Sequence, residues 1–237
     1  TQKKVIDLGN IETDTLVIAP YEIIYAGNDE GEIIVINKNT RTCIKAHQAG
    51  IKRIVLSKNA RWCVSISYDR TVKLWEVDSN GKLSLQDESV LPAQVWPRSA
   101  SFLGDQQVVF GTFGTTYATY NFETKKWDTS KIQNTRGLNA VAIFQSDIYA
   151  VGDSGIVFKN QKKFRELGSL CNFLLPYGNY LLAGGQLGTV FDVISGEKIY
   201  QHRSPLNCGA VFSNGGHDAL AILGSYTGEA LVLKTLA

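Results

Sequence analysis

His47, Ser65 and Asp69 lie close together in the sequence and are the residue types of a serine-type catalytic triad. In such a triad the histidine takes the proton of the nucleophilic hydroxyl, and the carboxylate orients the histidine. Hydrolases that use this chemistry often hold the nucleophile on a strained turn with the pattern G-x-S-x-G. No such pattern accompanies these three residues, so the sequence does not favour nucleophilic catalysis here.

The cysteines and histidines are too scattered to predict a metal centre. Zinc sites usually draw their ligands from closely spaced pairs such as C-x-x-C, which this sequence lacks. The residues concerned are Cys43, Cys63, Cys171, Cys208, His47, His202 and His217. We expect the cysteines to be small apolar core residues in a reducing compartment. This predicts a cytoplasmic protein without metal or cofactor.

Composition sets the size of the core and narrows the range of partners. The chain has 237 residues, of which 44% are hydrophobic and 19% charged, enough for one large folded core. The formal net charge of +2 is too small for a protein whose main task is to bind nucleic acid or an anionic membrane surface. No apolar run approaches the roughly 18 residues of a membrane span.

A repeated pattern organises the whole chain: an apolar strand, a tight turn containing glycine or aspartate, and a second strand. The pattern recurs at Gly27, Ser67, Gly111, Gly152, Gly184 and Gly224. A spacing of about 40 residues is typical of a four-stranded propeller blade. Glycine, asparagine and aspartate suit these turns because tight hairpins require positive φ angles.

The second repeat divides most clearly into four short strands, at residues 51–57, 60–67, 71–77 and 82–86. Few segments show a helical period. We therefore predict an all-β fold, a β-propeller of about six four-stranded antiparallel blades in a single domain spanning residues 1–237. The sixth repeat ends with its third strand, 230–236, so we expect the N-terminal strand 4–8 to pair with it and close the propeller. An open six-blade fragment of a larger propeller is the competing interpretation.

Residues 46–76 resemble a WD repeat. Ala46-His47 stands for the Gly-His of that family, Trp75-Glu76 stands for its Trp-Asp, and Asp69 precedes the tryptophan by six residues. The resemblance implies a structural hydrogen-bond network of His47, Ser65 or Ser67, Asp69 and Trp75, which explains the triad-like residues without catalysis. The other five repeats are degenerate: none is expected to carry the histidine.

The resemblance also implies that partners bind the loop face of the propeller. Loops on a rigid scaffold concentrate binding residues, and exposed tryptophan, tyrosine and arginine are typical of binding hot spots. We expect the partner-binding residues to be Lys52, Tyr68, Trp96, Arg98, Phe113 and Tyr226. The first strands of the repeats, aligned on their apolar centres, should open with Asp14, Lys52, Arg98, Asn139, Cys171 and Cys208.

The sequence thus predicts a scaffold or adaptor that binds an acidic or amphipathic protein segment over the second and third repeats, without catalysis. An inhibitory or toxin-neutralising binding protein would carry the same features. The alternative from another class is a propeller enzyme with its site over the central channel. That alternative requires converging carboxylates, and the available acids are Asp14, Asp29, Glu30, Asp69 and Asp153.

Overall fold

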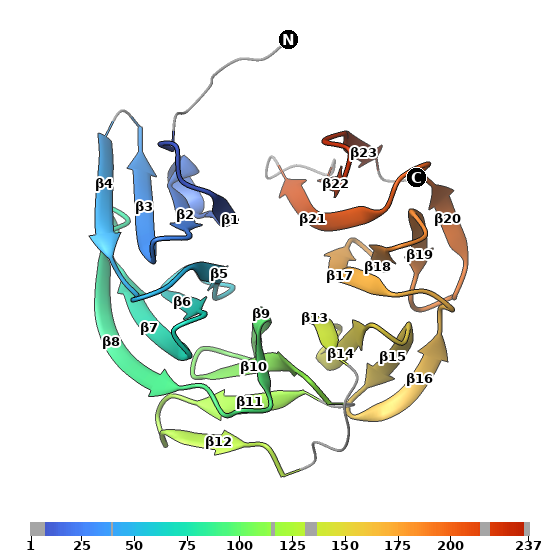
Figure 1. Ribbon diagram of the computed structural model, residues 1–237, viewed down its shortest axis with the longest axis horizontal. Coiled ribbons are helices and arrows are strands. Elements are labelled where there is room, and N and C mark those ends of the chain that lie inside the picture. The colour runs from blue at the N-terminus through green and yellow to red at the C-terminus, as the bar shows by residue number, and fades with distance from the viewer. Residues whose placement is uncertain (1–7, 39, 115–116, 131–136, 214–218, 235–237) are drawn as a thin grey trace. The chain divides into compact units, whose positions relative to one another are not determined.

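The computed structural model describes residues 8–38, 40–114, 117–130, 137–213 and 219–234, and these form six antiparallel sheets in sequence order (Figure 1). We call the sheets blades 1 to 6. Blade 1 contains β1 (Thr13–Ile18), β2 (Ile24–Asn28), β3 (Glu32–Asn37) and β4 (Thr40–Lys45), and blade 2 contains β5 (Ile51–Leu56), β6 (Trp62–Ser67), β7 (Thr71–Val77) and β8 (Leu83–Val90). Blade 3 contains β9 (Val95–Phe102), β10 (Gln107–Thr112), β11 (Ala118–Asn121) and β12 (Lys126–Asp128).

The remaining blades repeat this meander. Blade 4 contains β13 (Leu138–Phe144), β14 (Asp147–Gly152), β15 (Ile156–Lys159) and β16 (Lys162–Glu166), and blade 5 contains β17 (Cys171–Tyr177), β18 (Tyr180–Gly185), β19 (Thr189–Asp192) and β20 (Lys198–Gln201). Within the described residues blade 6 has three strands: β21 (Leu206–Ser213), β22 (Ala219–Ser225) and β23 (Ala230–Lys234).

This arrangement confirms the predicted all-β propeller of six antiparallel blades. The helical content of the described residues is one 3-10 turn at Pro20–Glu22, and no described helix is long and apolar enough to cross a membrane. Closure by the N-terminal strand stays a prediction, because residues 1–7 and 235–237 lie outside the described residues.

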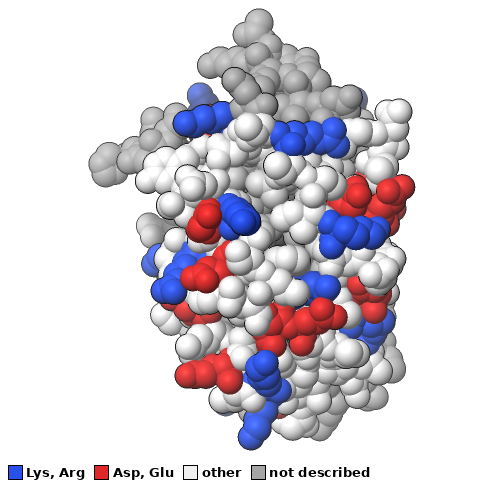
Figure 2. Space-filling view, turned by 90° about the vertical axis from the view of Figure 1, so that its left-hand side faces the viewer, with Lys and Arg blue, Asp and Glu red and all other residues white. Residues whose placement is uncertain are grey.

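Burial decreases from the second to the fourth strand of a blade. Strands β6, β10, β14 and β18 are buried almost throughout, as expected of strands covered on both faces. The fourth strands β4, β16 and β20 are mostly exposed and rich in charged or polar residues. Figure 2 shows the side that carries β4 and β8, where basic and acidic side chains lie next to one another without a large patch of one sign.

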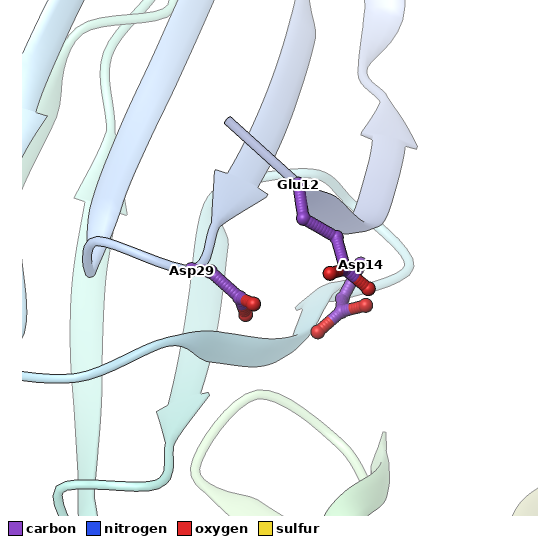
Figure 3. Close-up of side chains that lie close together, drawn as sticks. All are labelled: Glu12, Asp14 and Asp29. Carbon is purple, nitrogen blue, oxygen red and sulfur yellow. The ribbon is translucent and has the colours of Figure 1, made fainter. Parts of the chain in front are cut away.

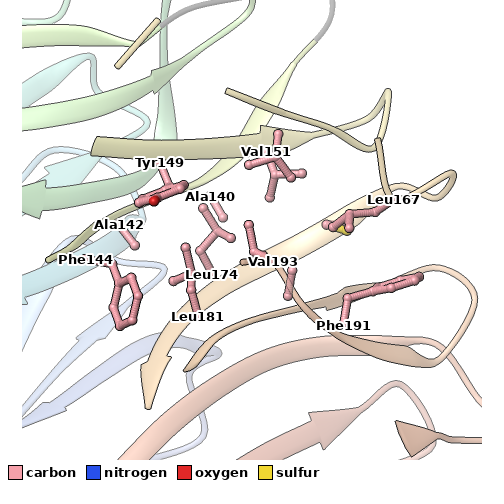
Figure 4. Packing of buried hydrophobic residues seen from close by; sticks show 13 residues of the cluster. Ala140, Ala142, Phe144, Tyr149, Val151, Leu167, Leu174, Leu181, Phe191 and Val193 are labelled. Carbon is pink, nitrogen blue, oxygen red and sulfur yellow. The ribbon is translucent and has the colours of Figure 1, made fainter. Parts of the chain in front are cut away.

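The chain forms two compact units. Unit 1 comprises residues 1–93, 102–108 and 120–126, and unit 2 comprises residues 94–101, 109–119 and 127–237. The core of unit 1 packs blade 1 against blade 2 through Tyr25, Ile33, Ile51, Ile54 and Trp75, among others. In unit 2 a cluster that includes Val151, Leu174, Leu181 and Phe191 joins blades 4 and 5 (Figure 4). Each core is made of side chains from facing blades, so the blades hold one another in place.

Candidate functional site

The buried polar side chains of blade 2 form a continuous hydrogen-bond network. The indole N–H of Trp75 donates to the hydroxyl of Ser65 over 2.9 Å, and that hydroxyl lies 2.8 Å from Nε2 of His47. On the other side of the ring, Nδ1 of His47 lies 2.8 Å from the hydroxyl of Thr71 and 3.2 Å from Asp69. His47 is 1% exposed. This network therefore locks β6 and β7 to the loop before β5 and leaves the imidazole no access to a substrate.

The carboxylate of Asp69 connects this network to the backbone. It accepts hydrogen bonds from the backbone N–H groups of Gln48 and Thr71, each over 2.8 Å, and from the Thr71 hydroxyl over 2.6 Å. Partial burial raises the pKa of Asp69, but these hydrogen bonds outweigh it and hold the pKa below its ordinary value. Burial of the His47 ring lowers the pKa of that imidazole. The pair is therefore a neutral imidazole beside a carboxylate.

The structure distinguishes the two serines that the sequence interpretation left as alternatives, and it adds one residue to the network. Ser65 is the serine between His47 and Trp75, whereas Ser67 donates to the carbonyl of Ala49 and accepts from the N–H of Asp69. Thr71 takes part although the sequence interpretation omitted it. Its position two residues after Asp69 was a usable signal, because a threonine hydroxyl there reaches the carboxylate across a tight turn.

The expectation that no other repeat carries the histidine is wrong. The backbone N–H of His202 donates a hydrogen bond to the carbonyl of Gly188 over 2.8 Å. The backbone N–H of His47 donates to the carbonyl of Gly31 over the same distance, so the two histidines hold equivalent positions. Nε2 of His202 lies 3.1 Å from Glu229. The sequence hid this equivalence because Gln201, and not a glycine or alanine, precedes the histidine.

Unit 2 builds a pocket of about 540 Å³ to which blades 3 to 6 contribute. Four of the six sequence-predicted binding residues line it, together with three residues that carry side-chain amides, one carboxylate, one glycine and one leucine. Its residues are Trp96, Arg98, Phe113, Gly137, Asn139, Asp153, Leu170, Asn172, Gln186 and Tyr226. The structure thus brings together residues that lie up to 130 positions apart in the sequence.

Aromatic rings and one guanidinium group give this pocket its character. The rings of Trp96 and Phe113 meet edge to face with centroids 4.2 Å apart, and the guanidinium of Arg98 lies 5.0 Å from the Trp96 ring centre. Phe113 is 39% exposed and Tyr226 64% exposed. Within the described part of the chain, no carboxylate pairs with Arg98, and the indole N–H of Trp96 is buried without an acceptor. The pocket therefore offers ring surface beside a cation that no described carboxylate neutralises.

The asparagines of the pocket come from β-bulges in the first strands of their blades. The register of β13 shifts between Leu138 and Ala140, and that of β17 shifts between Cys171 and Phe173, so Asn139 and Asn172 are the extra residues. A bulge re-aims the side chain of its extra residue. The amide of Asn139 bonds Asp153 over 2.9 Å, and that of Asn172 bonds the carbonyl of Leu206 over 2.9 Å.

The six aligned first-strand positions are not structurally equivalent: β17 opens with Cys171 as expected, but in the last two repeats the aligned cysteine lies one residue from the bulge. The bulged residues there are Asn172 and Asn207, not Cys171 and Cys208, whereas Asp14, Lys52 and Asn139 are the extra residues of their strands as aligned. The bulge explains this offset. An extra residue interrupts the alternation of inward and outward side chains, and the sequence alignment relied on that alternation.

Lys52 and Tyr68, the other two predicted residues, lie together in unit 1. The ammonium of Lys52 lies 4.7 Å from the ring centre of Tyr68, which is 49% exposed. The same ammonium forms ion pairs with Asp14 and Asp29. Its partial burial lowers the pKa, but the two carboxylates outweigh this and raise the pKa of Lys52 to about 12. Lys52 is therefore a neutralised cation, and the Tyr68 ring is the accessible surface of this patch.

Asp14 and Asp29 also converge with Glu12, so that carboxylate oxygens of all three lie within 4.8 Å of one another (Figure 3). Converging carboxylates of this kind are what the alternative function, a propeller enzyme, requires. All three residues are exposed, and Lys52 already supplies the positive charge that balances two of them. Ion pairing therefore accounts for this cluster without a metal ion.

Comparison with known proteins supports the fold and one repeat. The family model described as "WD domain, G-beta repeat" matches residues 37–76. Protein RBL of Arabidopsis thaliana is 32% identical over 59 residues, which span 23% of this chain but 11% of that protein. A crystal structure of the computationally designed Ika8 protein superposes with a TM-score of 0.65 at 17% identity, covering 95% of this chain and 72% of the other. Residues 37–76 are thus a repeat of the WD domain, G-beta repeat family, carried by a chain with the β-propeller fold.

Proposed function

We propose that this chain is a non-catalytic protein-interaction module that binds its partner at the pocket of unit 2. WD-repeat propellers are commonly protein-interaction scaffolds. The observation that carries the proposal is the conjunction of Trp96, Arg98 and Phe113 in one pocket, edged by the exposed ring of Tyr226. Tryptophan, tyrosine and arginine in a partly desolvated hollow are the residues that dominate the free energy of protein–protein binding.

The chemistry of the pocket favours an acidic or amphipathic segment. Arg98 lacks a carboxylate partner among the described residues, and a guanidinium group binds a carboxylate through two parallel hydrogen bonds. The edge-to-face rings beside it provide apolar area at low entropic cost. A partner side chain such as glutamate, next to an aliphatic or aromatic residue, satisfies both groups at once.

The Tyr68 patch of unit 1 is a second, weaker candidate contact. Its ring is exposed, but Lys52 cannot attract a partner carboxylate strongly because Asp14 and Asp29 already neutralise it. In this proposal Tyr68 adds apolar area and Lys52 orients the ring.

The proposal is tested with affinity capture of a stoichiometric partner, followed by calorimetric titration of that partner against variants. We expect Arg98→Gln and Trp96→Ala each to weaken binding by about thirtyfold or more, the range of hot-spot residues. Arg98→Gln should leave the melting temperature unchanged, because Arg98 is exposed.

Arg61→Ala is the matched control. Arg61 stacks on Trp62 at 5.4 Å in unit 1, in the same way as Arg98 stacks on Trp96, but it lies outside the proposed pocket. Undiminished binding by both pocket variants, or an equal loss with Arg61→Ala, would exclude the pocket as the binding site.

The free cysteines support a reducing compartment such as the cytoplasm as the place of action. None of the four forms a disulfide, and Cys63 and Cys171 are buried. Burial raises the pKa of the Cys171 thiol to about 12, which keeps it protonated and inert.

A further inference from the structure

Two rows of residues cross blade 5 on the face that packs against blade 6. Register places one residue from each of β17, β18 and β19 in each row, and all six are buried: Phe173, Gly184 and Val190 in one row, and Leu175, Leu182 and Asp192 in the other. The apolar members pack with residues of blade 6, namely Leu206, Ala221 and Leu223. These rows are therefore interface positions between one blade and the next.

Within the described part of unit 2, no other blade packs on the same rows of blade 6. Register places Cys208, Gly224 and Ala230 in one row, and Ala210, Ile222 and Val232 in the other. None of the six is buried; Ile222 is 37% exposed and Val232 54% exposed. Every side chain in these rows is apolar or a thiol, although the positions face solvent. We call this set the blade 6 open face.

An apolar face of this kind is costly to leave in water. Burying apolar surface stabilises by about 25 cal/mol per Å², and contiguous exposed apolar patches on soluble proteins usually mark interfaces. Among the described residues blade 6 has three strands, and no fourth described strand pairs with β23.

We propose that, in place of the closure expected from the sequence, the blade 6 open face binds a propeller-type blade supplied by a partner polypeptide. Continuity with the interface between blades 5 and 6 specifies the occupant: an antiparallel sheet that presents one apolar face, as blade 6 presents Leu206 and Leu223 to blade 5. The surface of this interaction is separate from the pocket of unit 2, so it does not depend on the proposed function.

Side-chain size refines the chemistry of this partner. The rows contain cysteine and alanine where blade 5 has larger residues: Cys208 corresponds to Phe173, Ala210 to Leu175 and Ala230 to Val190. Because protein interfaces pack as densely as interiors, a smaller face needs larger side chains opposite it. The partner blade should therefore present phenylalanine, leucine or methionine where blade 6 itself presents Ala221.

The first experiment asks whether the face is open in the isolated chain. Cys208 lies in the open face, and Cys43 is the other exposed thiol, so a Cys43→Ser variant leaves one accessible cysteine. We expect N-ethylmaleimide to modify Cys208 within about tenfold of the rate in denaturant, while Cys63 and Cys171 stay protected by burial. Protection of Cys208 comparable to that of Cys171 would mean that the chain covers this face itself, and would overturn the proposal.

The second experiment identifies the occupant. The photo-crosslinker p-benzoylphenylalanine replaces Val232 in the full chain, expressed in its native cells, and the cross-linked peptide is sequenced. The proposal expects a peptide from an apolar strand of another polypeptide, and loss of that product when Ile222→Glu is added. A crosslink within the chain, a crosslink to a second copy, or no product would each overturn it.

A matched control separates specific docking from general exposure. Leu187 lies in a turn of blade 5, is 57% exposed and belongs to neither row. The crosslinker at Leu187 should give none of the product obtained from Val232. The same product from both positions would show nonspecific contact and contradict the proposal.

Discussion

The hydroxyl of Ser65 joins the Trp75 indole to the His47 imidazole, and the far side of that imidazole reaches Thr71 and Asp69. With Nδ1 protonated, every member has a partner: Trp75 donates to Ser65, Ser65 donates to Nε2, and Nδ1 donates toward Thr71 and Asp69. Buried polar groups stabilise a fold only when all of them are satisfied. At the scale of single residues, His47, Ser65 and Asp69 therefore belong to a hydrogen-bond network that stabilises blade 2.

Removal of the Asp69 carboxylate directly tests how much this hydrogen-bond network stabilises the fold. Asp69→Ala leaves two backbone N–H groups and the Thr71 hydroxyl without their acceptor. We expect the free energy of unfolding to fall by about 1–3 kcal/mol, measured by urea denaturation, because each orphaned group keeps its desolvation penalty. Partner affinity of the folded fraction should not change. Unchanged stability would show that the network contributes nothing.

The imidazole makes stability depend on pH. Burial holds the pKa of His47 below its ordinary value of 6.5 in the folded chain, whereas the unfolded chain keeps that ordinary value. As the pH falls below about 6.5, the unfolded chain binds more protons than the folded chain, so linkage lowers the free energy of unfolding.

We therefore expect stability to decrease from pH 7.5 to pH 5, and His47→Gln to lose part of that decrease. Urea denaturation at a series of pH values, on both chains, measures the difference. Parallel pH profiles for the two chains would contradict a buried, neutral His47.

At the scale of elements, the β-bulge is the feature that builds the pocket. A bulged first strand turns its extra residue toward the neighbouring blade, as Asn172 shows by its bond to the carbonyl of Leu206. The same device places the amide of Asn139 against Asp153 of its own blade and 3.3 Å from the carbonyl of Cys171 in blade 5. The bulges therefore combine two roles: they tie adjacent blades together and supply the polar groups of the pocket.

Asn172→Ala should lower the free energy of unfolding by about 1 kcal/mol, because it leaves the Leu206 carbonyl without this hydrogen bond. Thermal denaturation monitored by circular dichroism measures the effect. Asn207→Ala is the matched control, since Asn207 is the extra residue of the bulge in β21 but is exposed. Equal losses in both variants would show that the bulge amide does not tie blades 5 and 6 together.

At the scale of the whole molecule, no disulfide contributes to stability. The four cysteines are free, and the cores that hold the blades consist of packed aliphatic and aromatic side chains. We expect the melting temperature to be the same with and without dithiothreitol, measured by differential scanning calorimetry. A lower melting temperature in dithiothreitol would contradict the free-thiol state and the reducing compartment.

The sequence by itself determined the blades. Apolar strands separated by glycine-containing turns at a spacing of about 40 residues specify four-stranded sheets, because strand alternation and turn geometry are local properties of the backbone. His47, Asp69 and Trp75 were identifiable in the same way, since their roles follow from fixed positions within one repeat. The prediction that Trp96, Arg98, Phe113 and Tyr226 are binding residues rested on residue type and loop position, which are also local.

The tertiary structure alone decided which residues meet. A bulge adds one residue without a compositional mark, so the bulged residues are Asn172 and Asn207, where the alignment had placed their neighbours Cys171 and Cys208. Pairing across blades decided that His202 stands where His47 stands, and that Lys52 is neutralised by Asp14 and Asp29. Such contacts join residues far apart in the chain. They depend on register and packing between sheets, which no local pattern in the sequence encodes.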